Sequence, residues 1–252
     1  MSRNFELIQQ LGQVSSVGAT HVATPRVEAE TVNAIQHGAR LDFDQVAREE
    51  TLRLVQRVFL LQTQEPPHMV VFAAIDKGSG CSEICVRVAE TLVNNTGGSI
   101  CLVEANFRSP TLPQMFGTTN HYGLTDALLG EGPIRSFAKP VSNKNLWLLS
   151  CGSLAVDSAN LLNSERIKTR FQELRDEFDY VIIDAPPMSR YADAMALGKL
   201  ADGFVLVLEA NSTRREAAMR VTESLSQAQI RVLGAVLNKR TFPIPESLYR
   251  RF

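Results

Sequence analysis

Hydrophobic residues in this chain form short apolar runs separated by longer amphipathic stretches. The runs are rich in β-branched and aliphatic residues, which is typical of strands buried on both faces. They cover 68–75, 99–103, 146–150, 180–184, 204–208 and 232–238. Between them, apolar residues recur mostly three or four positions apart, as in helices; examples are Leu162, Ile167, Phe171, Leu174 and Phe178, and Ala217, Val221, Leu225 and Ala228. The alternation predicts an α/β fold, a mainly parallel sheet of about six to eight strands with helices on both faces.

The chain before the first apolar run has two parts. Residues 1–40 are polar and irregular, which predicts a flexible N-terminal arm. From 42 to 64, apolar residues recur at roughly helical spacing until Pro66-Pro67, so we expect one amphipathic helix there. We therefore expect two regions, the arm over 1–40 and a folded domain over 41–252.

Composition and charge narrow the class of protein. The 252 residues include 26 Lys+Arg and 27 Asp+Glu, a net charge of −1 that argues against nucleic-acid binding. Hydrophobic residues make up 44%, enough for a sizeable core. The longest apolar run, 69–75, is too short to cross a bilayer, and the start of the chain has no secretory signal. The expected localisation is therefore cytoplasmic.

The four cysteines are too few for a disulfide framework in a chain of this length. Cys81 and Cys85 stand four residues apart, and together with the scattered histidines they could in principle hold a metal. The four histidines, however, lack ligand spacing, and free cysteines are common in cores. We therefore favour a core role for the cysteines over a metal site.

A glycine-rich segment follows the first apolar run. Residues 76–83 read DKGSGCSE, and a helix is expected from Ile84 to Asn94. A strand, a glycine-rich turn and a helix start form a phosphate cradle, in which backbone N–H groups and the helix dipole hold the anion. Such a loop normally carries lysine immediately before its Ser or Thr, and here that position is Cys81. The segment predicts a phosphate-binding loop with altered chemistry.

Acidic residues end two of the predicted strands. Glu104 follows the run at 99–103, and Asp184 ends the run at 180–184. The carboxyl ends of parallel strands meet at one edge of a sheet, where an acid opposite a phosphate loop holds a magnesium-bound water. Each acid alone is equally compatible with an ordinary turn. Their order relative to the loop favours a magnesium site.

With these motifs, the sequence resembles the cytoplasmic kinase domain of the bacterial tyrosine autokinases of capsule and exopolysaccharide synthesis. These are relatives of the ParA/MinD ATPases and imply a P-loop NTPase fold. The resemblance runs from about Glu49 to Lys239. Besides the loop, it is carried by VEANFRSP at 103–110, FG at 116–117, GLTDALLG at 123–130, ANLLNSER at 159–166, FDYVIIDAPP at 178–187, LADG at 200–203, TRREA at 213–217 and GAVLN at 234–238.

The resemblance implies a cofactor, ATP or ADP with Mg²⁺, and roles for the loop residues. Gly78, Gly80 and Ser82 would lie at the phosphates, with Ser82 also at Mg²⁺. Cys81 occupies the position of the phosphate lysine and removes its positive charge. Lys77, four residues upstream, is the nearby residue whose ammonium group could replace it.

The resemblance also assigns the strand-end residues. Asp184 would be the Walker B acid, and Asn238 would contact adenine. Glu104 and Asn106 stand where the family has two aspartates that serve the metal and activate the attacking hydroxyl. Glu104 keeps the charge on a longer side chain, whereas Asn106 removes the candidate base. Glu104, Asn106 and Asp184 are thus the implied catalytic positions, and Ser82, Glu104 and Asp184 the implied magnesium ligands.

Glu83 adds a negative charge in the first helical turn, where the family usually has Thr or a small residue. It either supplies charge that a bound phosphate would otherwise give the loop, or it points to solvent. Phosphoryl transfer depends mostly on positioning and on charge stabilisation. With the lysine lost, we expect nucleotide binding and transfer to be weak or absent.

Two further family features are altered. The family's assembly motif, Glu-x-x-Arg-x-x-Arg, here reads Glu50, Arg53 and Arg57, with the second arginine one residue late. In a regular helix this shift turns the side chain by about 100°. Ring assembly is therefore disfavoured. A homo-oligomer in which Glu50 pairs with Arg53 of another copy remains open. The simpler interpretation is that Glu50 and Arg53 form a solvated charge pair within one helix.

The C-terminal segment lacks the family's tyrosine cluster. Only Tyr249 stands near the end, which excludes autophosphorylation on a cluster. The basic residues there suggest either contact with anionic lipid or an acidic partner, or simply a solubilising end; they are Lys239, Arg240, Arg250 and Arg251.

Three functions follow from these observations. The substitutions favour a pseudokinase subunit of exopolysaccharide or capsule synthesis and export. It would act through a membrane chain-length (co-polymerase) protein or an intact tyrosine kinase, at the inner face of the membrane. The alternatives are an active autokinase with an unusual loop and a ParA/MinD-type ATPase. Nucleotide binding with Mg²⁺ discriminates among them.

Overall fold

The computed structural model describes residues 43–61, 66–142, 144–152, 162 and 164–240. The expected arm over 1–40 lies outside the described residues. Contacts divide the chain into two units, Met1–Glu50 and Thr51–Phe252. The second unit contains the whole sheet and the glycine-rich segment.

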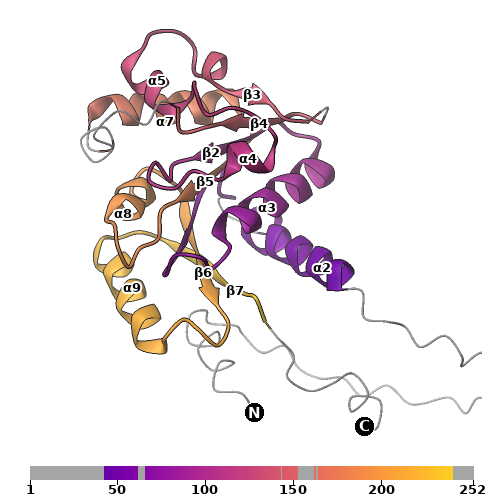
Figure 1. The fold of residues 1–252 in the computed structure, drawn as a ribbon, viewed down its shortest axis with the longest axis vertical. Coiled ribbons are helices and arrows are strands. Elements are labelled where there is room, and N and C mark those ends of the chain that lie inside the picture. The colour runs from indigo at the N-terminus through magenta and orange to yellow at the C-terminus, as the bar shows by residue number, and fades with distance from the viewer. Residues whose placement is uncertain (1–42, 62–65, 143, 153–161, 163, 241–252) are drawn as a thin grey trace, which may run out of the picture. The chain divides into compact units, whose positions relative to one another are not determined.

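Seven strands form a single sheet in the order β3-β4-β2-β5-β1-β6-β7 (Figure 1). All neighbours run parallel except β3, which is antiparallel to β4. The predicted parallel α/β sheet is confirmed, and the one unpredicted strand is β3, which is only two residues long and contains a proline. The strands are β1 Met69–Ala74, β2 Ile100–Glu104, β3 Lys139–Pro140, β4 Leu146–Leu149, β5 Tyr180–Ala185, β6 Gly203–Glu209 and β7 Val232–Asn238.

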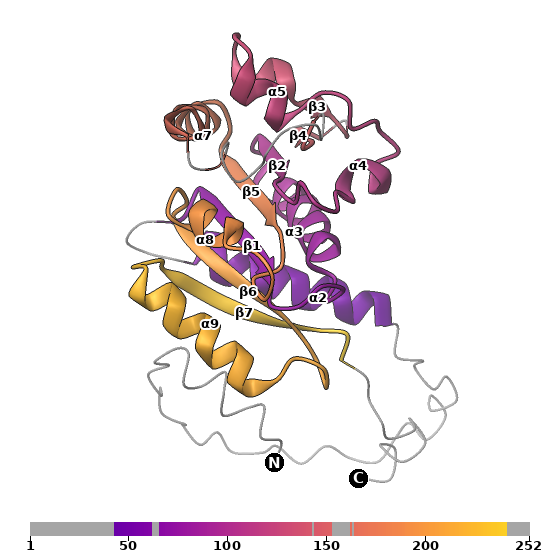
Figure 2. The same cartoon turned by 60° about the vertical axis from the view of Figure 1, so that its left-hand side comes forward.

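Helices cover both faces of this sheet (Figures 1 and 2). One face packs against α3 and α4, and the other against α5, α7, α8 and α9. The parallel strands need such crossovers, since each must return to the same end of the sheet before the next begins. The helices that follow β1 in the described residues are α3 Cys81–Thr96, α4 Leu112–Met115, α5 Leu124–Leu129, the 3₁₀ helix η2 Ile134–Phe137, α7 Glu165–Glu177, α8 Asp193–Gly198 and α9 Arg215–Gln227.

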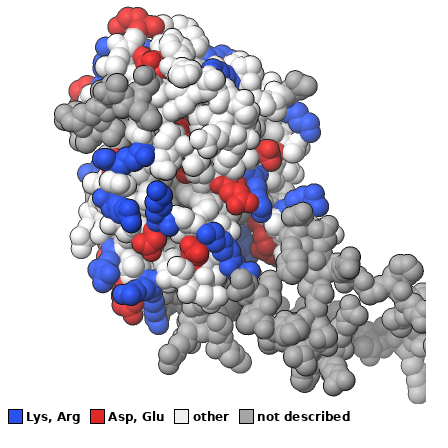
Figure 3. Space-filling view, viewed as in Figure 1, with Lys and Arg blue, Asp and Glu red and all other residues white. Residues whose placement is uncertain are grey.

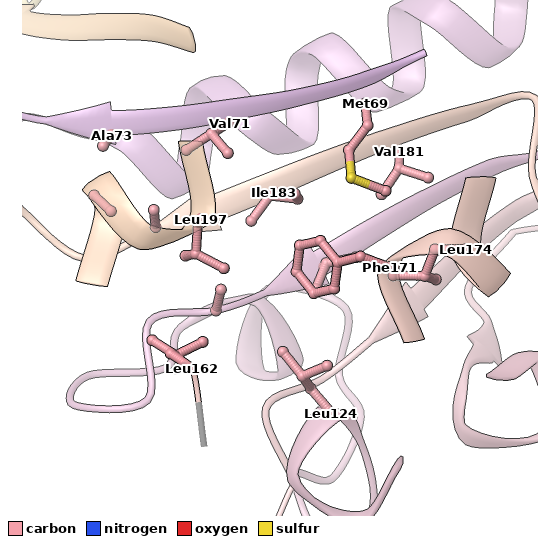
Figure 4. Packing of buried hydrophobic residues seen from close by; sticks show 14 of the residues in the cluster. Met69, Val71, Ala73, Leu124, Leu162, Phe171, Leu174, Val181, Ile183 and Leu197 are labelled. Atoms are coloured by element: carbon pink, nitrogen blue, oxygen red, sulfur yellow. The ribbon is translucent and has the colours of Figure 1, made fainter. Parts of the chain in front are cut away.

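Strand β1, in the interior of the sheet between β5 and β6, contributes to two hydrophobic clusters, one on each face. Successive side chains of a strand point to opposite faces, and all six of its residues are buried. Met69, Val71 and Ala73 join the cluster that includes Phe171 of α7 and Leu197 of α8 (Figure 4). The alternate residues of the strand pack toward α3. Burial on both faces explains why the sequence shows an unbroken apolar run.

The segment predicted as one helix over 42–64 contains two kinds of helix. The α-helix α2 spans Phe43–Val55, and a π-helix, η1, spans Gln56–Leu60. The π-turn is closed by the bond from Leu61 N–H to the Gln56 carbonyl, at 2.7 Å. A regular helix to residue 64 is thus wrong beyond Val55, and 62–64 lie outside the described residues. The wider turn accommodates an extra residue, and Val58 and Phe59 remain buried.

Surface charge and helix hydropathy add two findings. In the face shown in Figure 3, Lys and Arg side chains lie among Asp and Glu side chains, as the net charge of −1 leads one to expect. Within the part of the chain that the structure describes, no helix combines the length and the apolar character that crossing a bilayer requires.

Candidate functional site

The glycine-rich segment forms a loop between β1 and α3 at the carboxyl edge of the sheet. Gly78 and Gly80 have φ of +91° and +81°, which glycine adopts without strain. A Cβ on Gly80 would lie 2.4 Å from Asn238 Nδ2. Both the left-handed backbone and the close approach of β7 therefore require glycine at position 80.

The start of α3 presents unpaired backbone donors. Among the described residues, no group accepts from the N–H groups of 80–83, and the N-cap Gly80 provides no side-chain cap. Unsatisfied N–H groups at the start of a 16-residue helix, together with its dipole, attract an anion. The backbone of this loop thus fits a phosphate group, as the sequence predicted.

Asp184 lies beside this loop. The Ser82 hydroxyl donates a hydrogen bond to Asp184 Oδ2. The other carboxylate oxygen, Oδ1, is buried and has no hydrogen-bond partner among the described residues. Burial raises the pKa of Asp184, although hydrogen bonds from Ser82 and from the thiols of Cys81 and Cys85 oppose the rise. A hydroxyl beside a carboxylate with an unused oxygen fits Mg²⁺, which prefers oxygen ligands.

Glu104 pairs in register with Asp184 across β2 and β5. Its carboxylate is buried and accepts three backbone N–H groups, those of Asn106 at 3.3 Å, Thr111 at 2.8 Å and Leu112 at 2.9 Å. Burial and the charge of Asp184 raise its pKa. The carboxylate thus holds the turn after β2, a role that the sequence did not indicate.

Asn106 has a buried side-chain oxygen, Oδ1, without a hydrogen-bond partner among the described residues. The structure therefore brings the three implied catalytic positions to one edge of the sheet, two of them as adjacent strand ends. Their catalytic roles remain predictions.

Two thiols complete the cluster around Asp184. The sulfurs of Cys81 and Cys85 and a carboxylate oxygen of Asp184 all lie within 4.8 Å of one another. A hydrogen bond with Cys85 lowers the pKa of Cys81, but burial and the charge of Asp184 together raise it to about 11. Burial also raises the pKa of Cys85 well above its usual range. Sequence reasoning treated Cys85 as core, although the i, i+4 spacing was the available signal.

The end of β7 holds the loop from the other side. Asn238 Nδ2 donates to the Ser79 carbonyl at 2.9 Å, and Lys239 Nζ donates to the Gly78 carbonyl at 2.5 Å. Lys239 also lies 3.5 Å from Glu209. The predicted adenine contact of Asn238 stays a prediction. Lys239, predicted only as part of a basic tail, is a loop-holding residue that sequence reasoning missed.

Two charged residues of the loop point away from the cluster. Lys77 is exposed and forms no hydrogen bond or ion pair with the described residues. Glu83 pairs with Arg87 one helical turn later, at 2.6 Å, and both side chains are largely exposed. Of the two interpretations of Glu83, this arrangement corresponds to the solvent-facing one.

The implied assembly residues lie in different units. Glu50 is exposed at the end of the first unit, and Arg53 and Arg57 are exposed in the second. Each of the three interacts with other groups of the chain. A role in oligomerisation stays a prediction. Tyr249, Arg250 and Arg251 lie outside the described residues.

The parallel sheet, the glycine loop before α3 and the acid beside Ser82 define a P-loop NTPase domain, a class that generally binds nucleotide with Mg²⁺. The family described as "ParA: NUBPL iron-transfer P-loop NTPase" matches residues 67–250. A relative, tyrosine-protein kinase YwqD of Bacillus subtilis (strain 168), is 32% identical over 169 residues, or 67% of this chain and 71% of that protein. The chain therefore belongs to the ParA-like P-loop NTPases and, within them, to the bacterial tyrosine kinases related to capsule and exopolysaccharide synthesis.

Two further similarities agree with this assignment. The succinoglycan biosynthesis transport protein ExoP of Rhizobium meliloti (strain 1021) is 29% identical over 174 residues, which cover 68% of this chain and 22% of ExoP. The kinase domain of the Escherichia coli tyrosine kinase ETK superposes with a TM-score of 0.72 at 19% identity, covering 84% of this chain and 87% of that one. The ETK likeness supports the fold alone.

Proposed function

We propose that this chain is a pseudokinase subunit of exopolysaccharide or capsule synthesis and export, with weak or lost nucleotide binding. The observation that carries the proposal is the thiol of Cys81 at the position of the phosphate lysine. With its pKa raised to about 11, this thiol is neutral at pH 7. A neutral group cannot supply the charge that stabilises the β and γ phosphates.

Neither nearby lysine restores that charge. Lys77 is exposed without a partner among the described residues, and the ammonium group of Lys239 already donates to the carbonyl of Gly78. Meanwhile Asp184 and Glu104 remain beside the site. A triphosphate would therefore meet acidic side chains without a lysine to balance them, which supports weak binding.

Calorimetric titration of the purified chain with ATP and ADP, in the presence of Mg²⁺, tests this proposal. We expect no micromolar binding by the unmodified chain and at least about tenfold tighter binding by Cys81→Lys, since a charge-assisted hydrogen bond contributes about 1.5–3 kcal/mol. Ser226→Lys, which adds the same charge on the exposed face of α9, is the matched control and should change nothing. Micromolar ATP binding by the unmodified chain would refute the proposal.

The alternative function is an active autokinase or a ParA/MinD-type ATPase. It is favoured by one observation: the unpaired N–H groups of 80–83 and the Ser82–Asp184 pair still fit phosphate and Mg²⁺. An active enzyme would hydrolyse ATP or label itself with phosphate, and Asp184→Asn would abolish either activity. Absence of both activities in the unmodified chain supports the pseudokinase.

We further propose that the chain acts at the inner face of the membrane through a partner, a chain-length (co-polymerase) protein or an intact tyrosine kinase. The match to 22% of ExoP supports this, because the chain corresponds to one part of that larger transport protein. Co-purification from native cells should recover such a partner. Deleting the gene should alter the amount or length of the polymer, whereas Asp184→Asn should not. A phenotype of Asp184→Asn equal to that of the deletion would favour an active ATPase.

A further inference from the structure

The cluster of Cys81, Cys85 and Asp184 has the composition of a metal site rather than of a core. The two cysteines lie one turn apart on α3, so their side chains share a face of the helix. The carboxylate reaches the same point from β5, and the three ligand atoms are within 4.8 Å of one another. The other two cysteines, Cys101 and Cys151, lie outside this cluster.

The spacing is close to that of a bound ion. With Zn–S bonds of about 2.3 Å, two sulfurs of a tetrahedral zinc site lie roughly 3.8 Å apart. The upper limit of 4.8 Å exceeds this by about 1 Å, a gap that small side-chain rotations close. Cys81 is only partly buried, whereas Cys85 and Asp184 are buried, so an ion can reach the cluster from the loop side.

A second observation points independently to a ligand. Asp184 is 1% exposed, yet its Oδ1 has no hydrogen-bond partner among the described residues. A buried carboxylate oxygen without a donor is costly, and such groups are rare unless an ion or water satisfies them. The unsatisfied oxygen therefore lies beside the two thiols at a place where a cation would stabilise it.

We propose that Cys81, Cys85 and Asp184 bind a thiophilic divalent cation, Zn²⁺, at the start of α3. Two sulfur ligands select zinc over magnesium, which prefers oxygen. Each thiol releases its proton to solvent as it binds the ion. The resulting Zn²⁺, two thiolates and one carboxylate carry a net charge of −1, the same as two neutral thiols beside an ionised Asp184. Zinc thus adds no positive charge for phosphate, and it occupies the carboxylate that Mg²⁺ would need.

Titration of the full chain with Co²⁺ under reducing conditions tests the site, since cobalt bound to thiolate gives a charge-transfer absorption in the near ultraviolet. We expect one Co²⁺ per chain and its displacement by Zn²⁺. Cys81→Ala and Cys85→Ala should lose the absorption, and Asp184→Asn should bind at least about tenfold more weakly. Cys101→Ala and Cys151→Ala, which remove thiols outside the cluster, are the matched controls and should bind normally.

The absence of absorption in the unmodified chain would overturn the site, as would absorption that persists in the Cys81→Ala/Cys85→Ala double variant or is unchanged by Asp184→Asn. Circular dichroism of each variant verifies folding. If Cys85→Ala does not fold, the partly exposed Cys81→Ala decides the question. Because the titration contains no nucleotide, its outcome is independent of whether the chain binds ATP.

Discussion

Replacing Asp184 by Asn should stabilise the protein at neutral pH. Asp184 is buried; Ser82 donates a hydrogen bond to its Oδ2, and the thiols of Cys81 and Cys85 also lower its pKa, but these interactions do not outweigh burial. Desolvation therefore penalises the ionised form and raises the pKa of this group. Asparagine keeps the shape and an acceptor for Ser82 but has no charge to bury.

The magnitude follows from the pKa of Asp184, which burial raises from 3.8 to about 6. This difference corresponds to ~3 kcal/mol against the ionised folded state at neutral pH. The new amide group must find acceptors among weakly accepting thiol sulfurs, which costs about 1 kcal/mol. The net gain is then ~1–2 kcal/mol, equivalent to about 2–8 °C in Tm for a domain of this size.

The stabilisation by Asp184→Asn should increase as the pH rises. Between the unfolded pKa near 4 and the raised folded pKa, the native state binds more protons than the unfolded state, so stability falls as pH rises. Asp184→Asn removes that titration. The difference in Tm should therefore be largest above about pH 6 and shrink as the pH falls toward 4. Glu104 adds to the effect in the same direction, because its raised pKa also depends in part on the charge of Asp184.

Asp179, just before the same strand, is the matched control. Its exposed carboxylate accepts the N–H of Ser99 at 2.7 Å and the Ser99 hydroxyl at 2.8 Å, which lowers its pKa. The Asp179 carboxylate therefore contributes its full stabilisation above its pKa in the unfolded chain. This stabilisation is lost as the pH falls through the lower pKa of the folded protein. Asp179→Asn should thus destabilise the protein at neutral pH, by ~0.5–1 kcal/mol after solvent screening.

Thermal unfolding followed by circular dichroism between pH 4.5 and 7.5 compares the three proteins. The two variants should move Tm in opposite directions at pH 7.5. A decrease in Tm for Asp184→Asn similar to that of Asp179→Asn would refute the reasoning. Such a decrease would mean that the folded protein stabilises the ionised carboxylate of Asp184 more than burial destabilises it.

Three further predictions concern other parts of the fold. Arg170 is buried and donates to three carbonyls of α5 and the turn after it, so Arg170→Met should lower the unfolding free energy by ~3 kcal/mol in a urea titration. Gly123→Ala should cost at least ~2 kcal/mol, because its Cβ would lie 2.1 Å from the Ser150 carbonyl oxygen; Gly234→Ala, with nothing within 4 Å, should be nearly neutral in the same titration. Lys239→Met should speed hydrogen exchange in the glycine loop, whose carbonyl it binds, while global stability changes by less than ~1 kcal/mol.

The sheet could be predicted because five of its strands are almost entirely buried and leave unbroken apolar runs; β7, partly buried along its whole length, is also apolar enough to leave one. The two-residue strand β3 leaves no such run, and one of its residues is Pro140. The π-turn after Val55 could not be predicted either. The apolar residues Val58 and Phe59 fit a regular α-helix equally well. No residue type specifies the backbone hydrogen bonds between residues i and i+5 that define a π-helix. Arg57 lies within this π-turn rather than in a regular helix, and its role in assembly stays a prediction.

Of the candidate site, the sequence revealed what is local and missed what is brought together over long distances. The loop glycines, Ser82 and Asp184 follow strands directly, so topology alone brings them to one edge. Lys239 contacts a carbonyl 161 residues earlier in the chain, which no local pattern encodes. The three backbone N–H groups that donate to Glu104 reach it only because the turn after β2 folds back over the carboxylate. The presence of an acid at the end of a strand does not predict such contacts.

The features that the site keeps are informative about its occupant. The uncapped start of α3 and the buried Oδ1 of Asp184 both reduce the stability of the fold. If the loop bound no ligand, substitutions that removed these two features would make the protein more stable. The cation of the loop, in contrast, is replaced by the thiol of Cys81. Nucleotide with Mg²⁺ would need Ser82 and Asp184 but not Cys85, whereas zinc needs both thiols. Cys85→Ala therefore separates the two occupants, because it should abolish zinc binding and leave the affinity for nucleotide, weak or strong, unchanged.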